Sequence, residues 1–172
     1  TTNKGDALLA AGCSREMSKI LASEILDNST HDLQKTFGNW VPREVRDKNY
    51  SETRLPIVPS AIFETLSHQN FPDMKYGLDP YFKFTLARSI YKTILRYCGK
   101  THNRKYVVTP LTPSNFRIDF TENGNGEVII SWNPVKDPLE PSAIPTAYRL
   151  YIAEGDGDFD NGIVVNGTSV RS

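Results

Sequence analysis

The hydrophobic pattern of the chain changes near residue 104, and this change constrains the fold more than any other feature. Before it, apolar residues recur every three or four positions, as on a helix with one buried face; after it, they alternate with polar residues, as on a half-buried strand. A chain of 172 residues can hold two small domains. The sequence therefore predicts one domain with its linker at residues 1–103 and an all-β domain at residues 104–172.

The first part of the chain predicts a helix that begins after Ser14. This serine is a suitable N-cap, because its hydroxyl can accept a hydrogen bond from an unpaired amide of the first turn. Met17, Ile20, Leu21 and Ile25 then recur at helical spacing and predict a single apolar face.

A second helix is predicted after Asp79, which can cap it. Pro80 suits the first helical position, and Gly99 predicts the end. The expected apolar stripe of this helix consists of Phe82, Leu86, Ile90, Ile94 and Tyr97. Between the two helices, the apolar run at Ile57–Phe63 is bounded by prolines and predicts a buried strand. The order helix, strand, helix favours an α/β layered domain.

The second part predicts short strands joined by turns. Three alternating runs mark the strands: Phe116, Ile118 and Phe120; Val128, Ile130 and Trp132; and Tyr148, Leu150 and Ile152. The turn ENGNGE between the first two carries two glycines that can adopt a positive φ. Short alternating strands with a tryptophan in the second favour a β-sandwich.

Charge and hydropathy exclude two classes of partner. Twenty basic residues balance twenty acidic ones, which gives no electrostatic case for nucleic acid or for an anionic membrane surface. No apolar run approaches 18 residues, so no membrane span is predicted. The oligomeric state stays open, although an exposed edge strand of the sandwich could pair with another copy.

Two cysteines, Cys13 and Cys98, match no metal-binding or redox spacing. They could form a disulfide in an oxidising compartment or remain two small buried hydrophobic residues. We expect that they are buried and do not form a disulfide.

The β part resembles a fibronectin type III domain over residues 106–172. The resemblance rests on Pro113 before the first strand, on VIISWNPV at residues 128–135 and on AYRLYIA at residues 147–153. It implies a sandwich that buries the tryptophan and tyrosine of these segments between its sheets. The last strands of such a sandwich are missing, so the predicted sandwich is incomplete.

The first part resembles, over about residues 12–98, the C-terminal part of zinc-dependent N-acetylmuramoyl-L-alanine amidases. The run PSAIFE, then TLSHQN, then Asp73 and the helix PYFKFTLARSIYKTILRY follow that family's order. The resemblance places Glu64 on the catalytic glutamate, Asn70 on an asparagine and Asp73 on an acidic position. Upstream, SREMSKILASEIL is similar to a family helix, and REVR at residues 43–46 is similar to an arginine-led segment.

This resemblance implies hydrolysis of the amide that joins N-acetylmuramic acid to L-alanine in peptidoglycan. Such a reaction uses a zinc-bound water of lowered pKa and a carboxylate that takes its proton. Glu64 would be this catalytic carboxylate. The family's zinc ligands, two histidines and a glutamate, precede the matched region and are not in this chain, so zinc is expected in the full-length family and not here.

The resemblances together predict a fragment of a longer bacterial protein, secreted to the periplasm or outside the cell, with peptidoglycan or another cell-surface glycan as partner. The chain alone is expected to be inactive. Similar multidomain proteins are also labelled xanthan lyases, but no residues here argue for that elimination chemistry. The rival hypothesis is a non-catalytic, amidase-like module that binds a glycan or a protein.

Other candidate residues have simpler interpretations. His68 lies four residues after Glu64, but a surface histidine is favoured over a metal ligand, and His31 and His102 lack partner spacing. Asn70 and Asp73 are expected to cap the turn that follows Glu64. DGDFDNG at residues 156–162 resembles the start of a calcium loop, yet it lacks the glycine and glutamate such a loop needs, so a hairpin turn is predicted.

Overall fold

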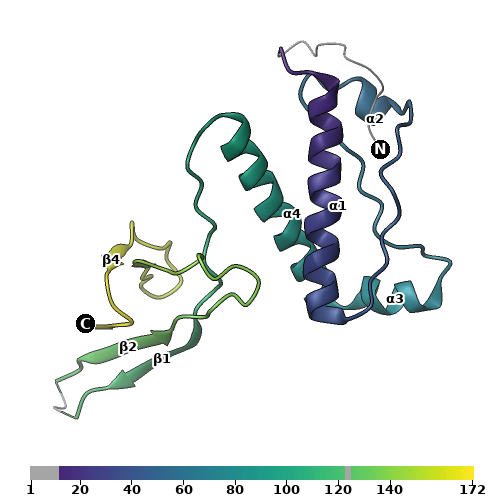
Figure 1. Ribbon diagram of the computed structural model, residues 1–172. Helices are drawn as coiled ribbons and strands as arrows, with labels where there is room; N and C mark the ends of the chain where they lie inside the picture. Colours follow the sequence, from purple (N-terminus) through teal and green to yellow (C-terminus); the bar gives the residue numbers. More distant parts are fainter. Residues whose placement is uncertain (1–11, 123–124) are drawn as a thin grey trace. The chain divides into compact units, whose positions relative to one another are not determined.

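The computed structural model describes residues 12–122 and 125–172, and the chain divides into two compact units between Tyr106 and Val107. The described elements of the first unit are helices, and those of the second are antiparallel strands (Figure 1). The chain thus combines helices with antiparallel sheets. None of the helices in the described ranges is long and apolar enough to cross a membrane.

The described residues of the first unit form four helices. These are α1 (Arg15–Phe37), α2 (Ser51–Arg54), α3 (Phe71–Leu78) and α4 (Pro80–Thr101). The two long helices, α1 and α4, pack against each other (Figure 1). The segments before and after α2 run without regular structure along α1, and a hydrogen bond from the Ser60 amide to the Ser18 hydroxyl (3.1 Å) ties the second of them to that helix.

The predicted helix starts are confirmed, whereas one predicted end is wrong. Ser14 precedes α1, but its carbonyl, not its hydroxyl, accepts the amide of the first turn. The Asp79 carboxylate caps α4 by accepting from the Tyr81 amide at 2.8 Å. Gly99 does not end α4, which continues to Thr101. Its small size instead admits the Tyr106 ring, because a Cβ at this position would lie 2.8 Å from a carbon of that ring.

The buried face of each long helix is more polar than the sequence predicts. Of the expected apolar face of α1, only Ile25 is fully buried, and Ile20 is 42% exposed. On α4 the predicted stripe is confirmed in part, because Phe82 and Tyr97 are buried whereas Ile94 is 43% exposed. The residues buried on the two helices are Ser18, Ala22, Ile25, Ser29, Asp32 and Leu33 on α1, and Phe82, Thr85, Ser89, Lys92, Thr93, Tyr97 and Gly99 on α4. Small and hydroxyl side chains let two helix backbones approach closely.

The hydroxyl groups buried here are partly satisfied within their own helices. Thr85 donates to the Tyr81 carbonyl and Thr93 to the Ser89 carbonyl, both at 2.9 Å. A threonine that bonds four residues back needs no partner on the neighbouring helix. Tyr97 does cross the interface, because its hydroxyl donates to the Met17 carbonyl at 3.0 Å.

A buried ion pair joins the two long helices. The Lys92 ammonium lies 2.9 Å from a carboxylate oxygen of Asp32, and the two side chains are only 2% and 8% exposed. Farther along, Lys100 lies 3.4 Å from Glu24. The step from Lys92 to Lys100 covers the same number of residues as the step back from Asp32 to Glu24. The helices are therefore antiparallel, and both pairs report the same register.

Aromatic rings fill the other end of the interface. Phe37 at the end of α1, Trp40 after it, Tyr76 on α3 and Phe82 on α4 lie with ring centroids 5.3–5.7 Å apart. Tilted and edge-on contacts of this kind add to the area that the rings bury. This cluster holds α3 and the segment after α1 against α4.

The predicted strand at Ile57–Phe63 is wrong. This segment is irregular, and Ile57 and Val58 are 59% and 52% exposed. Pro56 and Pro59 supply no amide hydrogen for a strand ladder, and the described part of the first unit contains no strand to pair with. The last three residues of the segment, Ala61, Ile62 and Phe63, are still half-buried. Apolar packing therefore holds them in place, although they belong to no sheet.

In its described residues, the second unit forms two small antiparallel sheets. Strands β1 (Ser114–Phe120), β2 (Val128–Asn133) and β5 (Ser169–Arg171) form one sheet in the order β1-β2-β5, and β3 (Tyr148–Leu150) pairs with β4 (Ile163–Val165) in the other. The three predicted strands are confirmed, although β3 ends before Ile152. The predicted ENGNGE turn lies partly outside the described residues.

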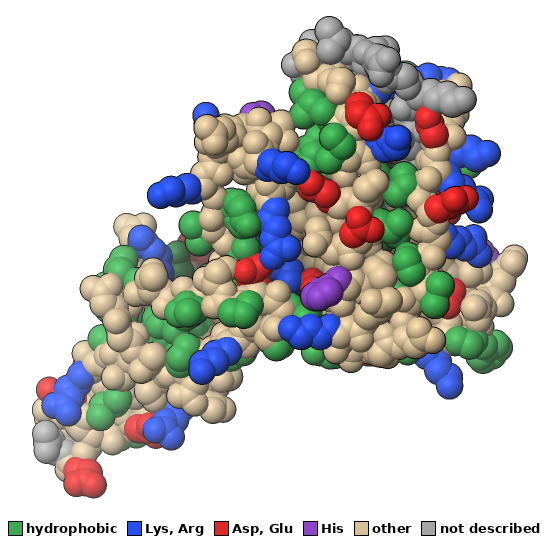
Figure 2. Space-filling model, in the orientation of Figure 1, with side chains coloured by type: hydrophobic (Ala, Val, Ile, Leu, Met, Phe, Trp, Pro, Cys, Tyr) green, Lys and Arg blue, Asp and Glu red, His purple; other side chains and the backbone are tan. Residues whose placement is uncertain are grey.

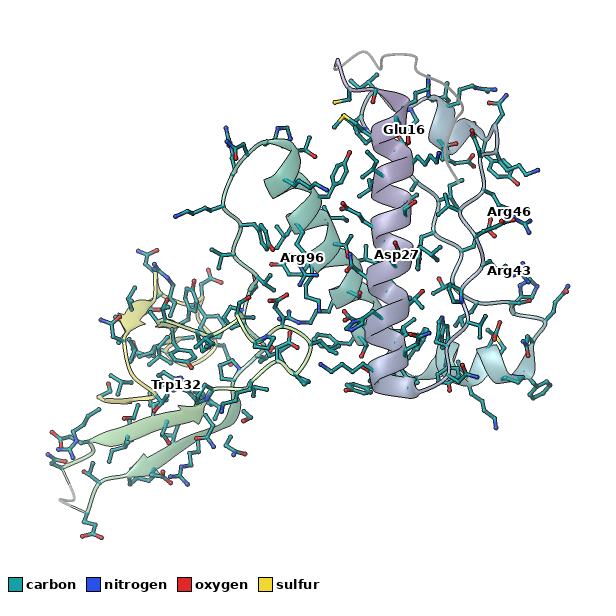
Figure 3. The ribbon with its side chains drawn as sticks, in the orientation of Figure 1. Glu16, Asp27, Arg43, Arg46, Arg96 and Trp132 are labelled. Carbon is teal, nitrogen blue, oxygen red and sulfur yellow. The ribbon has the colours of Figure 1, made fainter. Side chains whose placement is uncertain are left out.

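The core of this unit forms around Trp132, labelled in Figure 3. Ile130, Trp132 and Leu150 are buried, and Tyr148 packs edge-on against Trp132 with the ring centroids 5.2 Å apart. Because Trp132 belongs to one sheet and Tyr148 to the other, this contact joins the two sheets. The apolar side chains of β1 contribute less to this core. Phe116, Ile118 and Phe120 are each more than half exposed, and of these three Phe116 stacks on the Trp132 ring with the centroids 6.4 Å apart.

We expect single replacements in the Asp32–Lys92 pair to cost far more stability than the double replacement. Asp32→Leu or Lys92→Met leaves one buried charge without its partner, which costs about 3–5 kcal/mol. The double variant leaves no charge and should stay near the wild-type free energy of unfolding. Urea unfolding followed by helix circular dichroism measures the difference. Single variants that lose less than about 1 kcal/mol would contradict this role.

The same pair predicts a dependence of stability on pH. Burial alone would raise the pKa of Asp32, but the hydrogen bond and positive charge of Lys92 outweigh it and lower the pKa below 3.8. The stabilisation is therefore complete above pH 3.8 and is lost as the pH falls through the lower folded-state pKa. Unfolding measured at decreasing pH should show a smaller acid loss for Asp32→Asn than for the wild type, and Asp27→Asn on the exposed side of α1 is the control.

Candidate functional site

Glu64 lies on an irregular segment between α2 and α3, directly after the half-buried residues Ala61–Phe63. Its side chain is exposed, and it forms no hydrogen bond or ion pair with residues 12–122 or 125–172. The apolar residues before it fix the position of the backbone, while the carboxylate itself faces water. Glu64 is therefore accessible to a substrate.

The turn after Glu64 is fastened by Asp73. The carboxylate of Asp73, in the first turn of α3, accepts a hydrogen bond from the Ser67 amide at 2.8 Å, and the Asn70 amide donates to the Ser67 carbonyl at 3.0 Å. The prediction that Asp73 caps this turn is confirmed. Asn70 occupies the N-cap position of α3, but its side chain makes no capping hydrogen bond, so its expected capping role is wrong.

An open depression of about 550 Å³ lies where this turn enters α3. Its lining combines aromatic and charged side chains: Phe71, Pro72, Lys75, Tyr76 and Asp79. Phe71 is 86% exposed, so its ring presents a flat apolar surface to solvent. Rings of this kind can stack against the apolar face of a sugar.

The arginine-led segment does not join Glu64. Arg43 and Arg46 are exposed on the stretch between α1 and α2, and Figure 3 shows both on the side of this stretch away from α1. No hydrogen bond or ion pair links either arginine to Glu64 within the described ranges. The structure thus brings Asp73 to the turn after Glu64 and leaves the arginines apart from it.

The described residues do not fit a zinc site. In residues 12–122 and 125–172, no three histidine, cysteine, aspartate or glutamate side chains lie close enough together to hold a metal ion. The DGDFDNG segment forms a turn instead, in which one Asp160 carboxylate oxygen accepts from the amides of Ile152 (3.0 Å) and Gly162 (2.9 Å). The predicted turn is confirmed, and it connects β3 to β4.

The histidines and cysteines are dispersed. The Nδ1 atom of His31 lies 3.3 Å from an Asp32 carboxylate oxygen, while His68 lies exposed in the turn after Glu64 and His102 follows α4. Cys13 and Cys98 are unpaired. The expectation that both are buried is wrong, because Cys98 is exposed and Cys13 is half-buried.

Sequence reasoning missed a basic depression at the C-terminal end of α4. This open depression of about 750 Å³ is lined by Arg96, Gly99, Lys100, Asn103, Arg104, Lys105 and Tyr106. Its signal is present in the sequence, where basic residues recur at every fourth position from 88 to 104. Such spacing places side chains on one side of a helix, and Figure 2 shows Lys and Arg side chains gathered over α4.

Comparisons of this chain with protein-family models, with curated proteins and with solved structures find no match.

We expect Asp73→Ala to loosen the turn after Glu64 without unfolding the first unit. The change removes one charge-assisted acceptor from the Ser67 amide, and a comparable loss at a helix start costs about 1 kcal/mol. Hydrogen exchange of the Ser67 amide should become faster, while amides in the middle of α4 keep their protection. Asp47→Ala is a matched exposed control. An unchanged Ser67 exchange rate would show that Asp73 does not hold the turn.

Proposed function

We propose that this chain is the carboxylate-bearing part of an N-acetylmuramoyl-L-alanine amidase of a bacterial cell-wall hydrolase. It is followed by a fibronectin type III-like spacer and located in the periplasm or outside the cell. The observation that carries this proposal is the exposed Glu64 before a turn held by Asp73. These two acids are the positions that the amidase resemblance assigns to the catalytic glutamate and to the following acidic residue.

The carboxylate of Glu64 can act as a general base. A base must lie within hydrogen-bond reach of the proton that it takes, and Glu64 is accessible and has no competing partner among the described residues. It would take the proton of the attacking water and then pass one to the leaving amine. The fixed turn limits the movement of the segment after it, which keeps the carboxylate near its substrate.

The depression at the start of α3 supports binding of the glycan strand. Phe71 and Tyr76 offer aromatic surface, and Lys75 offers a cation for a carboxylate of the peptide stem. The β-sheet unit would act as a spacer. Peptidoglycan presents both sugar rings and carboxylates, so it fits this combination of side chains.

A Glu64→Gln variant tests the proposal in two settings. The 172-residue chain alone should bind purified peptidoglycan without hydrolysing it, because the described residues do not fit a zinc site. In a protein that joins this chain to a zinc-binding amidase part, Glu64→Gln should lower the release of peptide stems by about 10²–10⁴-fold, since it removes the general base, and should leave peptidoglycan binding unchanged. Glu52→Gln, an equally exposed acid on α2, is the matched control.

The rival proposal is that the chain is a non-catalytic, amidase-like module that binds a glycan or a protein. The observation that favours it is that Glu64 stands on an irregular segment rather than on the rigid strand that a positioned base prefers. This rival predicts no hydrolysis in either setting and equal peptidoglycan binding by the wild type and by Glu64→Gln. Hydrolysis that survives Glu64→Gln would contradict the amidase proposal directly.

A further inference from the structure

The end of α4 and the loop after it carry an unusual concentration of positive charge. From residue 80 to residue 106 the chain contains seven lysines and arginines and no aspartate or glutamate. A long helix with a mixed solvated surface normally carries both signs of charge. The one-sided composition calls for either internal partners or an external anion.

Internal partners account for only part of this charge. Lys92 is held by Asp32, and Lys100 lies 3.4 Å from Glu24 while its side chain stays 76% exposed. Arg104 and Lys105 are exposed and form no ion pair with the described residues. The lining of the depression contains four cations and no carboxylate, and Arg104 and Lys105 supply the positive charge that remains available there.

The loop that completes the depression is held in place by the helix end. The Arg104 amide donates to the Gly99 carbonyl at 2.8 Å, and the His102 amide donates to the Cys98 carbonyl at 3.0 Å. Asn103 adopts a left-handed conformation, with φ of 49°, which asparagine tolerates better than most residues. Gly99 permits the close approach of the Tyr106 ring and of the Arg104 carbonyl. The cations are thus presented by a folded loop before any ligand arrives.

We propose that this depression binds an anionic saccharide, a sugar chain that bears carboxylate or phosphate groups. Arginine and lysine side chains match such anions, and Tyr106, 45% exposed, offers an aromatic ring against which a sugar can lie. A nucleic acid would need a broader basic surface, whereas the chain as a whole has no net charge. This inference depends on α4 and its loop and not on Glu64, so it goes beyond the proposed amidase function.

Calorimetric titration of the full chain with an oligogalacturonate and with a phosphorylated mannan tests the proposal, and neutral mannan and duplex DNA serve as comparisons. Binding of either anionic saccharide should weaken as salt is added. Arg104→Ala/Lys105→Ala should weaken it about tenfold, since two charge contacts are lost. Lys48→Ala/Lys83→Ala removes the same charge from exposed positions outside the depression and should bind like the wild type. The anion that binds more tightly identifies the ligand chemistry.

A second variant tests the fold of the loop separately from its charge. Gly99→Ala retains every cation but forces the Tyr106 ring away from α4, so it should also weaken binding while α4 keeps its helix signal. Equal weakening by the two double variants, tighter binding of duplex DNA, or no binding of either anionic saccharide would overturn the proposal. Wild-type affinity in Gly99→Ala would show that the preformed loop contributes nothing.

Discussion

The first unit depends on the ion pair between Asp32 and Lys92. Two helices with small and hydroxyl side chains along their contact can slide against each other, because such side chains interlock weakly. A buried carboxylate and a buried ammonium tolerate no such movement, since each would lose its partner in a medium of low dielectric constant. The pair therefore selects one register, and the exposed pair of Lys100 and Glu24 follows it. The loop after α4 and the aromatic cluster at the opposite end are both placed by that register.

Helical periodicity located the long helices and only part of their buried faces. An apolar stripe normally faces the core, and Ile25, Phe82 and Tyr97 of the predicted stripes are buried, whereas Ile20 and Ile94 are exposed. The rest of each buried face consists of small and hydroxyl side chains beside a buried charge pair. No periodicity rule identifies Asp32 and Lys92 as partners, because they lie on different helices, and their attraction appears only when the helices are set side by side.

The predicted strands that are confirmed have a neighbouring strand to pair with, and the one that is wrong has none in the described part of its unit. The runs at Val128 and Tyr148 become strands because β1 and β4 lie beside them and complete their hydrogen bonds. The run at Ile57–Phe63 has Pro56 before it and Pro59 within it, and no strand lies beside it in the described part of its unit. The alternation of apolar and polar residues also predicted β1 correctly. It did not predict that the apolar face of β1 is largely exposed, because alternation alone does not show whether a second layer covers the strand. Glu64, expected at a strand end, stands on irregular chain for the same reason.

The polar contact between α1 and α4 has a thermal consequence. The heat capacity change of unfolding grows with the apolar area that becomes exposed and is reduced by exposed polar area. Serines, threonines and an ion pair contribute little or negatively to this heat capacity change. They therefore add little to the curvature of the first unit's free energy of unfolding as a function of temperature. The hydration penalty of a buried ion pair also falls on warming. The ion pair between α1 and α4 is thus a contact that loses little strength as temperature rises.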